Sequence, residues 1–274
     1  MFGNRERFAM TDGELEFEVA GEGEPVVFLH GFGLDLRMWE PQVRAFKTQF
    51  RLIRYDLRGF GCSTRPPVSP YAHEDDLNAL LTSLQALPAH IVGLSMGGRM
   101  ALRFALNYPA STRSLVLADA AFDGYSRSTD WQARWNGICD AAKLGEMTKA
   151  KRQWLEHPIF ATAKGDSQVW SLLAQMVDDY SGWHWHNSDT ARVSTPVTRF
   201  SEIDVPTLVV TGAKDLPDSL TAAEFLTRNL PKARRCVIER AGHMVNLEAP
   251  EEFNAAVVEF WHSLERGEPH LERN

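Results

Sequence analysis

Short apolar runs alternate with helical patterns along most of this chain. Continuous apolar runs favour strands buried on both faces, and apolar residues three and four positions apart, as in Leu77, Leu80 and Leu84, favour amphipathic helices. Strands joined by helices predict an α/β fold with a mainly parallel sheet and helices on both faces. Strands are expected at 25–29, 51–55, 89–94, 114–117, 207–211 and 235–239, and helices at 39–48, 73–86, 96–106, 219–229 and 251–263.

The segment 14–20 has a different pattern. Its apolar residues, Leu15, Phe17 and Val19, alternate with polar ones. Such alternation is typical of a strand with one buried face. We therefore predict an antiparallel strand at the edge of the sheet.

One connection between strands is much longer than the others. Between 120 and 205 the strand pattern is lost, whereas connections in α/β folds are usually short. Helical patterns at 131–144, 148–155 and 167–178 replace it. We predict a core formed by 1–120 and 198–274, and a helical cap inserted at 121–197. The insertion holds six of the eight tryptophans, which are Trp131, Trp135, Trp154, Trp170, Trp183 and Trp185.

Composition narrows the possible functions. The 274 residues are 44% hydrophobic and 24% charged, as in ordinary globular proteins. A formal charge of −7 argues against binding to nucleic acid. No apolar run approaches the roughly 20 residues of a membrane span, and the N-terminus lacks the pattern of a signal peptide. Three scattered cysteines, Cys62, Cys139 and Cys236, fit a reducing compartment, so we expect a cytoplasmic protein.

The strongest chemical signal is the run Gly-Leu-Ser-Met-Gly-Gly at 93–98. It lies between a predicted strand and a predicted helix, as a Gly-x-Ser-x-Gly nucleophile elbow requires. The serine of an elbow lies on a sharp turn, so the residues two positions away must be small, as Gly93 and Gly97 are. The turn also places Ser95 at a helix N-terminus, where free N–H groups favour a developing negative charge. We predict that Ser95 is a nucleophile.

A serine nucleophile needs a base to take its proton and an acid to orient that base. After such an elbow, the acid and the histidine follow the serine in that order. Asp215 follows the predicted strand at 207–211, and His243 follows the one at 235–239. Both therefore lie at the same carboxyl edge of the sheet as Ser95. We predict Asp215 as the acid and His243 as the base.

Two other aspartates are rivals for the role of the acid. Asp218 follows Asp215 closely, but its position fits the start of the next helix better. Asp119 follows the predicted strand at 114–117 and is the weaker rival.

Acyl transfer also needs N–H donors for the oxyanion. One candidate is the backbone N–H of Met96, the residue after the nucleophile. The other is expected from the loop His-Gly-Phe-Gly at 30–33, with the N–H of Phe32 as the donor. His30 itself is expected to form structural hydrogen bonds and not to act in catalysis.

These motifs together resemble the α/β-hydrolase fold superfamily, in particular its serine carboxylesterases and enol-lactone hydrolases. The resemblance covers about 15–263 and implies an eight-stranded sheet with a cap inserted after the sixth strand. Dehalogenases and epoxide hydrolases of this fold have Asp at the elbow, where this chain has Ser95. The motifs are 30–33, 55–63 (Tyr-Asp-Leu-Arg-Gly-Phe-Gly-Cys-Ser), 93–98, 212–215 (Gly-Ala-Lys-Asp) and 242–250 (Gly-His-Met-Val-Asn-Leu-Glu-Ala-Pro).

The predicted cap is where substrate specificity is expected. Its aromatic side chains can form an apolar pocket wall, although we expect at least half of them to form the core of the cap. Arg99 lies one helical turn after Ser95, either in a structural salt bridge or facing an acidic substrate. The predicted pocket residues are Trp131, Trp135, Trp154, Trp185 and Arg99.

No metal and no cofactor are expected. If the run Trp-His-Trp-His at 183–186 formed a strand, His184 and His186 would lie on the same face of it. A third ligand at a suitable spacing is missing, so the run does not predict a metal site.

These features predict a serine hydrolase that cleaves small to medium carboxylic esters or lactones through an acyl-enzyme on Ser95. Its activity should rise with pH through about 6.5–7 as the base loses its proton. The expected partner is a small-molecule substrate, and the oligomeric state stays open. Three alternatives remain: a carbon–carbon bond hydrolase, a receptor without enzymatic activity, and a lyase. The lyase reading comes from Gly97-Gly98-Arg99, which is similar to a sequence in a menaquinone-pathway enzyme of this fold.

Overall fold

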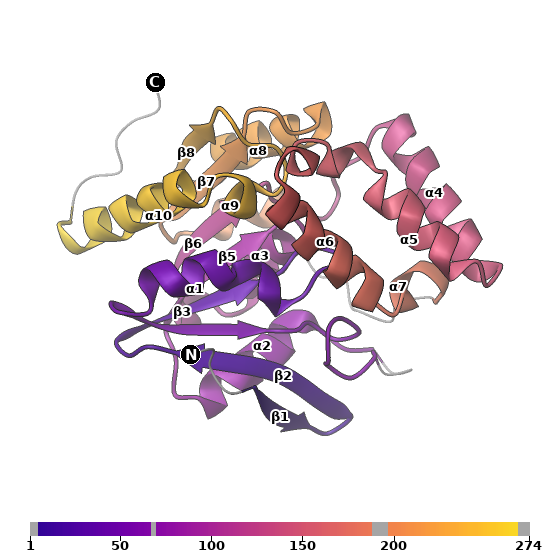
Figure 1. Ribbon diagram of the computed structural model, residues 1–274. Helices are drawn as coiled ribbons and strands as arrows, with labels where there is room; N and C mark the ends of the chain where they lie inside the picture. Colours follow the sequence, from indigo (N-terminus) through magenta and orange to yellow (C-terminus); the bar gives the residue numbers. More distant parts are fainter. Residues whose placement is uncertain (1–4, 67–69, 188–196, 268–274) are drawn as a thin grey trace.

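A computed structural model describes residues 5–66, 70–187 and 197–267 (Figure 1). Its strands form one eight-stranded sheet in the order β1-β2-β4-β3-β5-β6-β7-β8. The pairs β1·β2 and β2·β4 are antiparallel and the other pairs are parallel, so the predicted mainly parallel sheet is confirmed. The strands are β1 Glu6–Met10, β2 Gly13–Ala20, β3 Glu24–Leu29, β4 Phe50–Tyr55, β5 Ala89–Leu94, β6 Thr112–Ala118, β7 Thr207–Gly212 and β8 Ala233–Ile238.

Most strands and helices lie within a few residues of their predicted positions. The central strands are largely buried, and Val26, Val27, Phe28 and Leu29 of β3 have no exposed surface. The helices are α1 Glu40–Phe46, α2 His73–Ser83, α3 Met96–Asn107, α4 Thr129–Lys143, α5 Met147–Leu155, α6 Ser167–Asp179, α7 Trp183–His186, α8 Pro217–Asn229, α9 Val245–Glu248 and α10 Pro250–Glu265.

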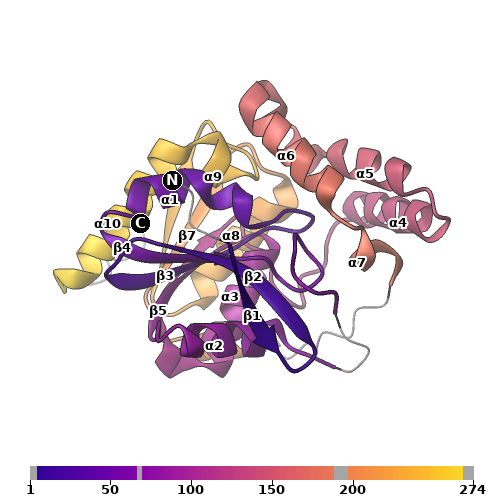
Figure 2. The same ribbon diagram turned by 60° about the horizontal axis from the view of Figure 1, so that its bottom comes forward.

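Helices cover both faces of the sheet. In Figure 2, α1, α9 and α10 lie on one side of the strands and α2 and α3 on the other. The helix α8 packs against β7 and β8. No helix within the described ranges combines the length and the apolar character needed to cross a bilayer.

The strand β1 was not predicted from the pattern, and it takes the edge position that we expected for 14–20. The strand at those residues, β2, is antiparallel as predicted, but it lies between β1 and β4 and not at the edge. The strand β1 pairs with β2 in antiparallel register, with Glu6 opposite Phe17 and Met10 opposite Gly13. Its residues are exposed or half-buried because it forms the edge of the sheet. A strand without a fully buried face leaves no clear alternation in the sequence.

The α-helices α4 to α7 lie between β6 and β7 in the chain. Both ribbon views show them gathered on one side of the sheet. Side chains cap two of them, since Ser128 accepts a hydrogen bond from the Trp131 N–H and Asp166 accepts from the Gln168 N–H. Parts of the ranges predicted for the core and the cap (1–4, 67–69, 188–196 and 268–274) lie outside the described residues.

Candidate active site

Ser95 lies on the turn between β5 and α3. Its φ of 54° and ψ of −111° give it a backbone conformation that residues other than glycine rarely adopt. Its N–H donates a hydrogen bond to the Ala118 carbonyl, which ties the turn to β6. A Cβ atom on Gly97 would collide with the Leu29 carbonyl oxygen, and one on Gly93 would collide with the backbone of Gly97. The two glycines therefore allow the turn that presents Ser95.

His243 and Asp215 meet although they follow different strands. Asp215 follows β7, His243 follows β8, and the distance from His243 Nδ1 to Asp215 Oδ2 is 2.6 Å. Burial pushes the pKa of Asp215 upward, but His243 and hydrogen bonds from the Leu216 N–H and Ser219 outweigh it, so this pKa is lowered. Asp215 therefore stays ionised and accepts the Nδ1–H of His243.

Neither rival acid takes this position. The Asp218 carboxylate instead accepts hydrogen bonds from the N–H and the hydroxyl of Ser128, at 3.0 and 2.9 Å. Asp119 accepts the Gly212 N–H at 3.2 Å, and its pKa is raised well above its usual value by burial and by the charge of Asp215. Of the three aspartates proposed from the sequence, Asp215 is the one bonded to His243.

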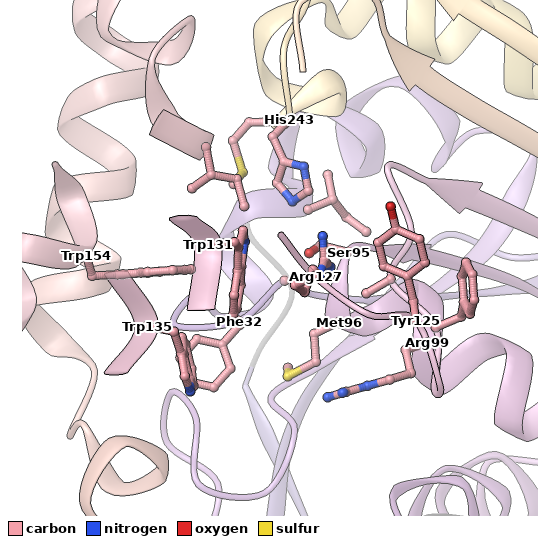
Figure 3. A pocket seen from close by; sticks show the side chains of 16 residues that line it. Phe32, Ser95, Met96, Arg99, Tyr125, Arg127, Trp131, Trp135, Trp154 and His243 are labelled. Atoms are coloured by element: carbon pink, nitrogen blue, oxygen red, sulfur yellow. The ribbon is translucent and has the colours of Figure 1, made fainter. Parts of the chain in front are cut away.

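The other nitrogen of His243 faces the cavity that contains Ser95. His243 Nε2 is buried and has no hydrogen-bond partner among the described residues. Ser95 and His243 line the same cavity of about 340 Å³. Figure 3 shows His243 above Ser95 at the centre of this cavity. Because Nδ1 is held by Asp215, Nε2 is the nitrogen that can exchange a proton there.

The two expected oxyanion donors belong to residues beside Ser95. Phe32 and Met96 both line the cavity, and Met96 is the first residue of α3. The loop that carries Phe32 is fixed by His30, whose Nε2 accepts the Leu57 N–H and whose Nδ1 lies 2.8 Å from the Gly31 carbonyl. Burial lowers the pKa of His30 to about 4, although the Gly31 hydrogen bond and Asp35 raise it. The structural role predicted for His30 agrees with these contacts.

The cavity wall contains most of the pocket residues predicted from the sequence. Trp131, Trp135, Trp154 and Arg99 line it, together with Phe32 (Figure 3). The indole rings of Trp131 and Trp135 are stacked, with 5.4 Å between their centroids.

Trp185 requires a correction because it does not line the cavity. It is 1% exposed and packs against Tyr180 and Phe32, with centroid distances of 5.0 and 6.2 Å. Its place on the short helix α7 turns it toward these rings and into the interior between α7 and the loop of Phe32.

The His184–His186 pair also differs from the prediction. Both residues lie on α7 and not on a strand. His184 Nδ1 lies 2.9 Å from the Tyr180 hydroxyl, and its ring stacks on Phe60 at 4.3 Å. His186 Nδ1 lies 2.9 Å from the Gly182 carbonyl. These contacts give both rings structural roles.

Sequence reasoning missed several cavity residues, of which Arg127 is chemically the most significant. Its guanidinium lies over the rings of Trp131 and Tyr125, at 5.1 and 5.6 Å from their centroids. A single arginine in a loop is usually exposed to solvent, so the sequence offered no signal apart from its spacing of four residues from Trp131. The other missed lining residues include Ile159 and Met244.

Comparisons with known proteins agree with this architecture. A 3-oxoadipate enol-lactonase from Acinetobacter baylyi is 29% identical over 231 residues, which cover 83% of this chain and 85% of the relative. A putative carbamate hydrolase from Caulobacter sp. is 29% identical over 257 residues, covering 88% and 91%. A thermophilic esterase from Thermogutta terrifontis superposes with a TM-score of 0.80 at 27% identity, covering 95% of this chain and 98% of the esterase. The family model of the alpha/beta hydrolase fold matches residues 24–250. The chain therefore belongs to the α/β hydrolase fold family.

Proposed function

We propose that this protein is a serine hydrolase that cleaves small to medium carboxylic esters or lactones. The observation that carries the proposal is the hydrogen bond between His243 and Asp215, formed at the cavity that Ser95 lines. The similarity to an enol-lactonase and to an esterase supports the choice of substrate class.

In the proposed mechanism, Ser95 Oγ attacks the carbonyl carbon while His243 Nε2 takes the hydroxyl proton. The C–O bond to the leaving alcohol then breaks, and His243 returns the proton to that oxygen. Water attacks the acyl-enzyme by the same route and regenerates Ser95. Asp215 holds the Nδ1–H tautomer and stabilises the imidazolium that forms in each step.

The tetrahedral intermediate carries a negative oxygen beside Ser95. We assign its stabilisation to the backbone N–H groups of Met96 and Phe32. The first lies at the N-terminus of α3, where the helix dipole adds to the effect. The second lies on the loop fixed by His30 and Leu57.

We further propose that 121–197 acts as a cap that selects the substrate. Its helices α4 and α5 supply Trp131, Trp135 and Trp154 to the cavity wall. The aromatic wall favours an apolar or planar substrate portion of modest size.

The proposal is tested with Ser95→Ala on p-nitrophenyl acetate and butyrate. Turnover should fall by roughly four decades, as it does when a serine nucleophile is lost elsewhere. The matched control is Ser171→Ala, because Ser171 is an exposed residue of α6, and it should keep wild-type turnover. A fluorophosphonate should label the wild type at Ser95. Ester hydrolysis that survives Ser95→Ala would refute the proposed mechanism.

Turnover assays on a wider range of substrates distinguish the three alternatives raised by the sequence. A substrate panel of short esters, enol lactones and 1,5-diketones separates ester or lactone cleavage from carbon–carbon cleavage. A lyase would release its product without consuming water. A receptor would cleave slowly or only once, whereas an esterase would turn over many times.

A further inference from the structure

The cavity beside Ser95 is positively charged although the whole chain has a formal charge of −7. Two guanidinium groups, those of Arg99 and Arg127, line it together with His243. No aspartate or glutamate of the described residues is among the side chains that line it. The charge of the cavity is therefore opposite to that of the protein as a whole.

The two arginines differ in their relation to carboxylates of the protein. Arg99 Nε lies 3.9 Å from Asp123 Oδ1. Arg103 donates two hydrogen bonds, of 2.6 and 2.9 Å, to the same carboxylate. In contrast, no carboxylate oxygen in the described ranges lies within ion-pair distance (4 Å) of Arg127. Arg127 therefore retains a positive charge that no close carboxylate of the described chain balances.

The surroundings of Arg127 hold it in place without neutralising it. Its guanidinium rests on Trp131 and Tyr125, which provide cation–π contacts. Burial lowers its pKa, against the opposing effects of Asp218, Tyr125 and Asp215, and a guanidinium in a protein stays protonated nevertheless. A charge that is partly removed from water gains most from a partner that supplies both an opposite charge and hydrogen-bond acceptors.

A second donor lies next to Arg127. The Nε1 atom of Trp131 is buried and has no hydrogen-bond partner in the part of the chain that the structure describes. Trp131 lines the cavity, and the Arg127 guanidinium lies over its ring. An anion with several acceptor oxygens would suit this neighbourhood better than a neutral group.

We propose that the cavity selects substrates that carry a free carboxylate in addition to the ester or lactone group, and that Arg127 binds this carboxylate. The inference rests on the proposed hydrolase function and names its substrate class. The planar guanidinium can form two parallel hydrogen bonds with a carboxylate, which a lysine cannot do. Arg127 is here a specificity-determining residue and takes no part in the chemical step.

The test uses pairs of substrates of similar size and shape, of which one member carries a carboxylate and the other is neutral. Monomethyl adipate is compared with methyl 6-methylheptanoate, in which an isopropyl group replaces the acyl-side carboxylate. For a carboxylate on the alcohol side, 4-acetoxybenzoate is compared with 4-isopropylphenyl acetate. In the wild type, kcat/KM for the anionic member of at least one pair should exceed that for the neutral member tenfold or more.

Arg127→Gln should reduce this preference at least tenfold, mainly through KM, and should weaken competitive inhibition by adipate to a similar extent. Arg127→Lys should retain part of the preference, because lysine keeps the positive charge but cannot form the two parallel hydrogen bonds. The matched control is Arg134→Gln. Arg134 is an exposed residue of α4 that pairs with Asp130, and its replacement should leave the preference at the wild-type value.

The outcomes separate this inference from the proposed function. If neither pair shows a preference for its anionic member, or if the preference survives Arg127→Gln, the inference is refuted while the hydrolase function stands. If no member of either pair is hydrolysed in a Ser95-dependent manner, both proposals are refuted for these substrates.

Discussion

His243 Nδ1 lies 2.6 Å from Asp215 Oδ2, and the two residues are 28 positions apart in the chain. The parallel strands β7 and β8 bring them together, since each residue follows the carboxyl end of its strand. Their contact fixes which nitrogen of His243 faces Ser95.

Replacing Asp215 removes the contact that orients the imidazole ring of His243. In Asp215→Asn, the amide can hold the imidazole in the wrong tautomer, so kcat on a neutral ester should fall by roughly 10⁴. Asp218→Asn is the matched control, because its carboxylate contacts Ser128 and not His243. It should keep most of the activity. Steady-state kinetics on p-nitrophenyl butyrate measure both variants, and equal losses would contradict the assignment of Asp215.

The second prediction concerns two glycines in very different surroundings. Gly97→Ala should lower the free energy of unfolding by several kcal/mol, because the new methyl group would collide with backbone atoms of β3. Gly137→Ala places a methyl group on α4, where no atom of the described residues lies within 4 Å apart from the chain neighbours and the nearby backbone of the helix itself. It should raise stability by about 0.5–1 kcal/mol, since alanine favours a helix more than glycine does. Urea denaturation measures both changes, and a stable Gly97→Ala protein would contradict the proposed crowding at the elbow.

The third prediction is a dependence of stability on pH that His30 causes. The folded-state pKa of His30 is about 4, below the ordinary value near 6.5, because its ring is buried. Between these two values the unfolded chain binds a proton and the folded protein does not. The contribution of His30 is therefore fully present above pH 6.5 and is lost as pH falls toward 4, at up to about 1.4 kcal/mol per pH unit.

The variant His30→Asn isolates this effect. Between pH 6 and 5, its free energy of unfolding should fall less steeply than that of the wild type, by about 1 kcal/mol per pH unit. Other buried groups also titrate abnormally, including Asp56 with a pKa of about 7 and His157 with one of about 4. They are present in both proteins and cancel in the comparison. Equal slopes in urea denaturation at the two pH values would refute the assignment.

The positions of the residues that follow the strands could be predicted because local sequence patterns determine where the strands end. The elbow around Ser95 needs small neighbours at fixed spacing, and a parallel sheet places residues that follow its strands, such as His243, at one edge. The pattern also revealed the strands of the core, since buried strands contain long apolar runs.

The parts that escaped prediction depend on packing between distant segments. Trp185 and Trp154 look equivalent in the sequence, but the arrangement of α5 and α7 places only Trp154 at the cavity. Arg127 precedes α4 in a polar stretch, and only the fold turns it over Trp131. The edge strand β1 has no fully buried face, so its sequence lacks the alternation of apolar and polar residues that would reveal a strand.

Phe32 links the chemistry to the aromatic wall. Its ring packs edge-on against Trp135, Trp154 and Tyr180, with centroid distances of 5.0, 5.7 and 5.7 Å. Its backbone N–H is the donor proposed for the oxyanion, so a shift in any of these rings moves that donor as well. Binding preference and catalytic rate should therefore change together when the wall is redesigned, and variants that accept bulkier substrates need compensating changes around Phe32 to regain turnover.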